Sequence, residues 1–104
     1  MHRLGFKMKL YAGQAEEYKH RHDELWPELK QLLKEATVSD YSIFLDEETN
    51  ILFGTLKVKD LEKFNQIPNN SITKRWWLYM SDIMDTNADN SPVSMDLKDV
   101  FYLA

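Results

Sequence analysis

Two neighbouring strand-like stretches that are apolar on both faces constrain this fold more than any other feature. Residues 41–46 alternate in polarity, residues 51–59 continue the pattern, and the polar turn 47–50 between them predicts a hairpin. In the first stretch Phe44 points opposite to Ile43, and in the second Phe53 points opposite to Leu52. An antiparallel sheet with one solvated face does not have this pattern. We therefore expect both faces to be covered, the second by another subunit.

The remaining elements follow from their periodicity. Residues 3–11 alternate as a half-buried strand, and residues 14–36 form a two-sided helix that Pro27 must kink or restart. A weak helical turn at 60–67 ends at Pro68, and Ser71 is expected to cap a helix that runs to about Met84. Residues 86–94 have turn chemistry, and "VFYL" at 100–103 predicts a last short strand.

The expected order is strand, helix, strand, strand, helix, strand, which predicts an α+β, ferredoxin-like βαββαβ sandwich. With 104 residues and no shift in composition, residues 1–104 are expected to form a single domain. So small a domain buries a modest share of its surface, which is a second reason to expect a homodimer.

Composition narrows the classes of partner. The net charge is −4 and Lys and Arg do not cluster, which disfavours nucleic acid or an anionic membrane as the main partner. The absence of cysteine excludes disulfides and thiol chemistry and fits the cytoplasm. No stretch approaches the roughly 18 apolar residues of a membrane span. We find no phosphate-binding loop and no metal-ligand cluster, so neither metal nor cofactor is predicted.

His22 is the most informative single residue, because it lies on the apolar face of the first helix. A buried imidazole needs hydrogen-bond partners, so a satisfied core histidine is one interpretation. The other is a general acid/base, since histidine exchanges protons near neutral pH. His20 points about 200° away from His22 on a helix, which excludes the two as a metal pair.

Aromatic side chains complete the set of candidates. Tyr18 and Tyr41 bring hydroxyls from the helix and the sheet toward the layer between them, where each is either a core aromatic or a polar contact. Trp76 belongs to the apolar stripe of the second helix, and Trp77 lies at its edge. Flat indole walls beside His and Tyr donors suit a small neutral polyol.

Three segments carry a resemblance to a known family. "YKHRHDELWPEL" (18–29), "KRWWLYM" (74–80) and "DNSPVS" (89–94), in this order and followed by "VFYL", closely resemble the L-rhamnose mutarotase family over essentially the whole chain. The resemblance implies a homodimeric α/β barrel that interconverts the α and β anomers of L-rhamnose, an isomerase of the aldose 1-epimerase type without a cofactor.

The resemblance also implies roles for five residues. The histidine matching His22 is the proton donor, and the residues matching Tyr18, Tyr41, Trp76 and Trp77 contact the sugar; all five types are present here. Two other interpretations use the same architecture. A haem-degrading enzyme or small oxygenase would use His22 as an iron ligand and the tryptophans as a wall for the porphyrin. A non-catalytic dimeric ligand-binding module would use Trp77 and Leu78 as an interface.

Overall fold

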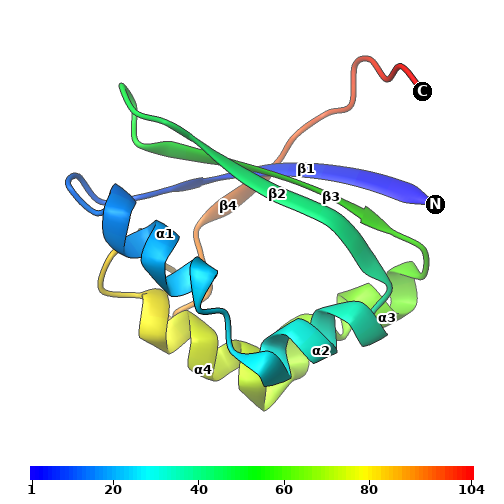
Figure 1. The fold of residues 1–104 in the computed structure, drawn as a ribbon, viewed down its shortest axis with the longest axis horizontal. Coiled ribbons are helices and arrows are strands. Elements are labelled where there is room, and N and C mark those ends of the chain that lie inside the picture. Colours follow the sequence, from blue (N-terminus) through cyan, green and yellow to red (C-terminus); the bar gives the residue numbers. More distant parts are fainter.

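The computed structural model describes residues 1–104, which form a four-stranded antiparallel sheet with helices on one face (Figure 1). In chain order the elements are β1 (His2–Lys9), α1 (Ala15–Asp23), α2 (Pro27–Glu35), β2 (Val38–Asp46), β3 (Ile51–Val58), α3 (Leu61–Asn65), the 3₁₀ helix η1 (Ile67–Asn69), α4 (Ser71–Met80) and β4 (Ser94–Asp96). The strand order is β2-β3-β1-β4, so the first and third strands lie side by side in the centre. This is the small α+β architecture predicted from the sequence.

The two faces of the sheet differ in what covers them. Leu52 and Leu56 of β3 and Met8 of β1 point toward the helices and are buried. On the opposite face Phe44 of β2 pairs in register with Phe53 of β3, and the two are 67% and 36% exposed. The prediction that these strands are apolar on both faces is confirmed, and within the chain only the helix-side face is covered (Figure 1).

A bulge interrupts β2 just before Tyr41. Ser39 pairs with Lys57 and Ser42 with Thr55, so β2 has one residue more than β3 in this stretch. Asp40 has a left-handed φ of 47°, and its carboxylate lies 2.9 Å from Lys57 Nζ. An inserted residue reverses the side-chain alternation, so Val38, which pairs with Val58, also points inward. Beyond the bulge Tyr41 alternates in phase with Ile43 and lies on the same inner face.

The helical segment 14–36 restarts at Pro27, one of the two outcomes expected. Helix α1 ends at Asp23, and α2 begins with Pro27 at its first position, where no backbone N–H is needed. The core formed by helices and sheet comprises Met8, Leu10, Tyr18, Leu29, Leu52, Trp76, Met80, Ile83 and Met84.

Two expected boundaries were wrong. The last strand is Ser94–Asp96, which pairs with β1, whereas residues 100–103 form no strand (Figure 1). The tail still contacts β1, because the Arg3 guanidinium lies 3.9 Å from the centre of the Tyr102 ring. Strand propensity in "VFYL" is not realised because it has no partner strand within the chain. Helix α4 ends at Met80 rather than Met84, because the Ser81 hydroxyl donates to the Leu78 carbonyl at 2.7 Å and closes the last turn.

The cap of α4 also differs from the expected one. The N-cap of α4 is Asn70 rather than Ser71, with its side-chain oxygen accepting from the Ile72 N–H at 2.8 Å.

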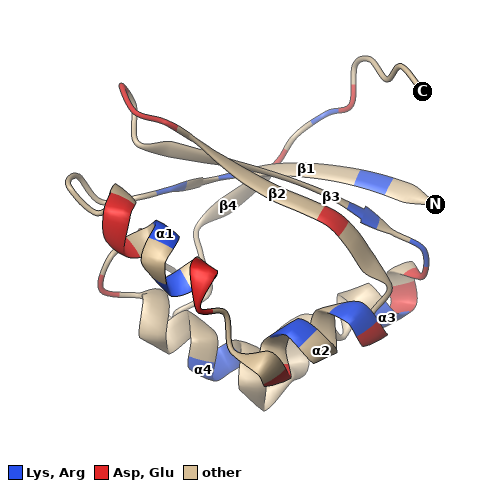
Figure 2. Cartoon of the chain, in the orientation of Figure 1, with Lys and Arg blue, Asp and Glu red and all other residues tan.

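Acidic and basic residues are interspersed along the elements instead of forming one large patch (Figure 2). None of the helices has the length and apolar character needed to cross a membrane.

Candidate active site

A cavity of about 1230 Å³ lies between the inner face of the sheet and the helices. It is larger than the roughly 300–1,000 Å³ typical of small-molecule sites. Its wall contains all five residues singled out from the sequence, namely Tyr18, His22, Tyr41, Trp76 and Trp77. The structure thus brings together side chains from α1, β2 and α4.

His22 is held between two aromatic rings. Its imidazole stacks on Tyr18, with ring centroids 4.3 Å apart and planes at 26°, and meets Trp76 edge-on at 5.4 Å. Its Nδ1 lies 3.0 Å from the main-chain carbonyl oxygen of Tyr18. Burial lowers the pKa of His22 below its usual 6.5, although the contact with this carbonyl and the charge of Asp23 act in the other direction. The imidazole is therefore neutral at pH 7.

The two tyrosines approach the cavity from facing elements, Tyr18 from α1 and Tyr41 from β2. Burial raises the pKa of Tyr18, and the nearby Tyr41 raises it further. Burial also raises the pKa of Tyr41 to about 12, although 41% of this residue is exposed. Both facts fit a side chain inside an open concavity, where water enters but protein atoms surround the hydroxyl. Both hydroxyls remain protonated at neutral pH and can donate hydrogen bonds.

Phe6 supports Tyr41 from β1, a contact that the sequence pattern does not predict. The two rings meet edge-on with centroids 6.2 Å apart. Phe6 lies over Gly54 of β3 so closely that a Cβ at Gly54 would overlap its ring atoms. A glycine inside a strand is the sequence signal for such a close approach.

The indole of Trp76 joins the cavity to the core. It is 9% exposed and contacts Trp26 edge-on at 5.1 Å and Tyr79 at 5.6 Å. Trp77, its neighbour on α4, is partly exposed and lines the same cavity. Trp76 is therefore a core residue with one side on the cavity.

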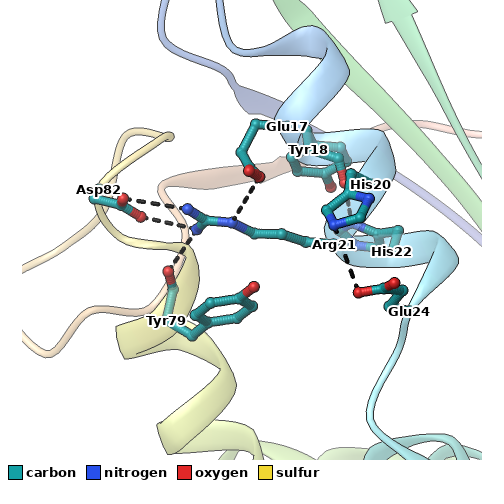
Figure 3. Close-up of polar contacts among 8 residues, drawn as sticks. All are labelled: Glu17, Tyr18, His20, Arg21, His22, Glu24, Tyr79 and Asp82. Atoms are coloured by element: carbon teal, nitrogen blue, oxygen red, sulfur yellow. Dashed lines mark hydrogen bonds and ion pairs between the residues drawn. The ribbon is translucent and has the colours of Figure 1, made fainter.

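Arg21 ties α1 to the C-terminal end of α4 (Figure 3). Its guanidinium donates to both carboxylate oxygens of Asp82, at 2.8 and 3.2 Å, and to the Tyr79 carbonyl at 2.7 Å. It also lies 4.4 Å from the centre of the Tyr79 ring and 3.6 Å from Glu17. The hydrogen bond from Arg21 lowers the pKa of Asp82. We call this set, Glu17, Arg21, Tyr79 and Asp82, the arginine clamp.

Other polar groups line the cavity as well. Thr73, one turn before Trp76, is 5% exposed, and its hydroxyl has no hydrogen-bond partner. Three of these groups, Asn87, Asp89 and Ser91, belong to the segment 86–94, for which the sequence predicts only turns. No three His, Asp or Glu side chains are placed where they could together hold a metal ion.

Comparison with known proteins assigns the chain to a family. The family model described as L-rhamnose mutarotase matches residues 3–103. The L-rhamnose mutarotase of Formosa agariphila is 59% identical over 103 residues, which cover 99% of each chain. The chain belongs to the L-rhamnose mutarotase family. Members from Lachnoclostridium phytofermentans and Listeria monocytogenes are 54% and 52% identical, over 99% and 100% of each chain.

One solved structure agrees with this assignment to the L-rhamnose mutarotase family, and a second shows the fold alone. The crystal structure of the Formosa agariphila L-rhamnose mutarotase superposes with a TM-score of 0.94, at 58% identity and over 100% of both chains. A conserved protein of Methanosarcina mazei shares the fold alone, with a TM-score of 0.63 and 18% identity over 94% of this chain and 91% of that one. Family membership favours the mutarotase interpretation over the haem-degrading and non-catalytic ones.

Proposed function

We propose that this protein is an isomerase of the aldose 1-epimerase type that interconverts the α and β anomers of L-rhamnopyranose. The observation that carries the proposal is one cavity in which a neutral imidazole, two tyrosine hydroxyls and two indoles meet. The chain around this cavity matches the family along almost its whole length. The substrate is a small neutral monosaccharide.

The reaction needs only proton transfer and positioning. Mutarotation opens a cyclic hemiacetal, rotates the C1–C2 bond and closes the ring on the other face. Opening requires that the anomeric hydroxyl lose a proton and that the ring oxygen gain one. We assign proton transfer to His22, and one positioned acid/base group contributes about 10²–10⁴-fold in rate.

The aromatic residues hold the sugar while its anomeric centre turns. Trp76 and Trp77 offer apolar surfaces to the C–H groups of the ring, and Tyr18 and Tyr41 offer hydroxyls to its oxygens. The two indoles contact the sugar ring through flat surfaces, so they hold the ring without surrounding C1, which can still turn.

Anomer exchange tests this proposal. Exchange between α- and β-L-rhamnose, followed by NMR saturation transfer, should accelerate with added protein and return to the uncatalysed rate in His22→Ala. His20→Ala is the matched control, because His20 is an exposed histidine on the same helix. Wild-type protein that leaves the exchange rate unchanged would disprove the proposed function. A fully active His22→Ala variant would remove His22 from the mechanism.

We also propose that two chains associate through the outer face of the sheet to form the dimeric α/β barrel expected of this family. Phe44 and Phe53 leave an apolar surface on that face, and Met95 of β4 is 61% exposed. Such a surface is the usual mark of an interaction site. The cytoplasmic location expected from the sequence stays a prediction.

A further inference from the structure

The hydrogen bond of His22 fixes which of its ring nitrogens carries the proton. The partner of Nδ1 is the main-chain carbonyl oxygen of Tyr18, at 3.0 Å. A carbonyl oxygen can only accept, so Nδ1 must donate. In the neutral imidazole the second nitrogen, Nε2, then has no hydrogen and presents a lone pair. The resting residue offers a proton acceptor through Nε2.

We propose that His22 begins the reaction as the base, taking the proton of the anomeric hydroxyl at Nε2, and that the Tyr41 hydroxyl is the acid that protonates the ring oxygen. This inference rests on the proposed function and deepens it, because it names the direction of each proton transfer. It differs from the donor role that the family resemblance implies for His22, and it supplies the second group that the reaction requires.

Position separates the roles of the two tyrosines. Tyr18 lies on the same helix as His22, and its ring is stacked on the imidazole while its carbonyl fixes Nδ1. Tyr18 therefore orients the imidazole of His22 through its ring and its carbonyl, on the side of Nδ1 and away from Nε2. Tyr41 comes from β2 on the facing side, where its ring meets Phe6 edge-on and lines the same cavity as His22. A sugar bound in this cavity between α1 and β2 would have the imidazole on one side and Tyr41 on the other.

Protons and bonds balance over the cycle. In opening, Nε2 of His22 takes the O1 proton, the C1–O1 bond becomes a carbonyl, the C1–O5 bond breaks, and O5 receives the Tyr41 proton. After rotation about C1–C2, the Tyr41 phenolate removes the proton from the O5 hydroxyl, and O5 attacks C1. The imidazolium returns its proton to the carbonyl oxygen. Both residues regain their starting state, and His22 is a donor only in this closing half.

The groups facing His22 fit an imidazole that is neutral at rest. On α1 the charged neighbour is Asp23, whose carboxylate is paired with Lys19 at 3.0 Å. From α4 the facing ring is the uncharged Trp76, and from β2 the titratable group is Tyr41. Because burial lowers the pKa of His22, the basic form dominates at and above neutral pH.

The first test measures the tautomer directly. Nitrogen-15 NMR of the wild-type protein at pH 7.5 distinguishes a protonated from an unprotonated ring nitrogen, and His22→Gln assigns the signals against His2 and His20. We expect His22 to carry hydrogen on Nδ1 and none on Nε2. An Nε2–H tautomer, or an imidazolium at this pH, would overturn the inference.

The second test uses rates. With His22 as base, kcat/KM corrected for the uncatalysed reaction should fall as pH drops through the lowered pKa of His22 and stay level from neutrality upward. If His22 had to be protonated at the start, kcat/KM would instead fall as pH rises above that pKa, which would refute the inference.

Paired variants separate the tyrosines. Tyr41→Phe should lose about 10²–10⁴-fold in kcat, the usual contribution of one acid/base group. Tyr18→Phe keeps both the carbonyl and the ring and should lose much less. A larger loss in Tyr18→Phe would refute the assignment of Tyr41. An active wild-type enzyme with the wrong tautomer defeats this inference alone, whereas an inactive wild-type protein defeats the proposed function itself.

Discussion

Gly54 is a residue whose missing side chain shapes the cavity. In Gly54→Ala the new Cβ overlaps the Phe6 ring, so the ring must shift together with Tyr41, which it contacts. We expect a loss of about 1–3 kcal/mol in the free energy of unfolding, measured by urea denaturation, and a lower kcat. Gly5→Ala is the control, because a Cβ there has no neighbour closer than 3.7 Å. Equal effects of the two substitutions would contradict the packing argument.

The buried hydroxyl of Thr73 allows a second prediction about the free energy of unfolding. Its buried hydroxyl has no partner, and leaving such a group unsatisfied costs about 1–3 kcal/mol. Thr73→Val should therefore raise the free energy of unfolding by about 1 kcal/mol. A less stable Thr73→Val variant would show that the hydroxyl has a partner in solution.

Single residues were predictable where their chemistry conflicts with their position. His22 was identifiable because an imidazole on an apolar helix face requires an explanation. Phe6 and Thr73 were not, because each matches the pattern of its own element. The bulge at Asp40 was also invisible in the sequence, since one inserted residue is defined only by the partner strand. The direction of Tyr41 was predictable, because it alternates in phase with Ile43.

At the scale of elements, the arginine clamp holds α1, which carries His22, against α4, which carries Trp76. Arg21→Lys loses the two-pronged contact with Asp82, because an ammonium cannot reproduce the guanidinium fork. We expect the edge-on contact between His22 and Trp76 to loosen, with kcat falling more than KM rises. Kinetics of anomer exchange measure both.

A double-mutant cycle checks that the two charges act as one unit. When Asp82→Asn is added to Arg21→Lys, the double variant should lose little more kcat than either single variant does. Glu24→Gln is the control, because Glu24 belongs to an exposed pair on the same helix. If the kcat losses of the two single variants simply add in the double variant, or if Glu24→Gln loses as much kcat as they do, the arginine clamp does not position the site.

The elements themselves were predicted unevenly, for physical reasons. The break before α2 was expected, because proline has no N–H to donate within a helix. The last strand was misplaced, because propensity favours "VFYL" but pairing with β1 selects Ser94–Asp96. The arginine clamp joins residues 61 positions apart. No local pattern could indicate it.

At the scale of the whole molecule, the outer face of the sheet should govern association. Phe44→Glu places a charge on the apolar surface beside Phe53 and should convert a dimer into a monomer, measured by light scattering coupled to gel filtration. Leu78→Glu is the control, because Leu78 is 60% exposed on α4, on the helical layer. A wild-type protein that is monomeric at micromolar concentration would refute the proposed dimer, and a monomer produced only by Leu78→Glu would move the interface to α4.

The architecture as a whole was the most predictable level. The succession of strand and helix periods was sufficient for the ferredoxin-like sheet, because its order follows from short connections and from pairing of neighbouring strands. The shape of the cavity was not predictable, since it depends on the break between α1 and α2, the bulge in β2 and the return of residues 86–94.

The position of β1 in the sheet has a consequence for how the chain is made. Strand β1 precedes both of its partners in the chain, β3 on one side and Ser94–Asp96 on the other. During translation it therefore waits for the first partner until residue 58 has been synthesised and for the second until residue 96 has. Assembly of the sheet is thus a late event in translation, and nascent chains that stall before residue 94 keep one edge of β1 open to foreign strands.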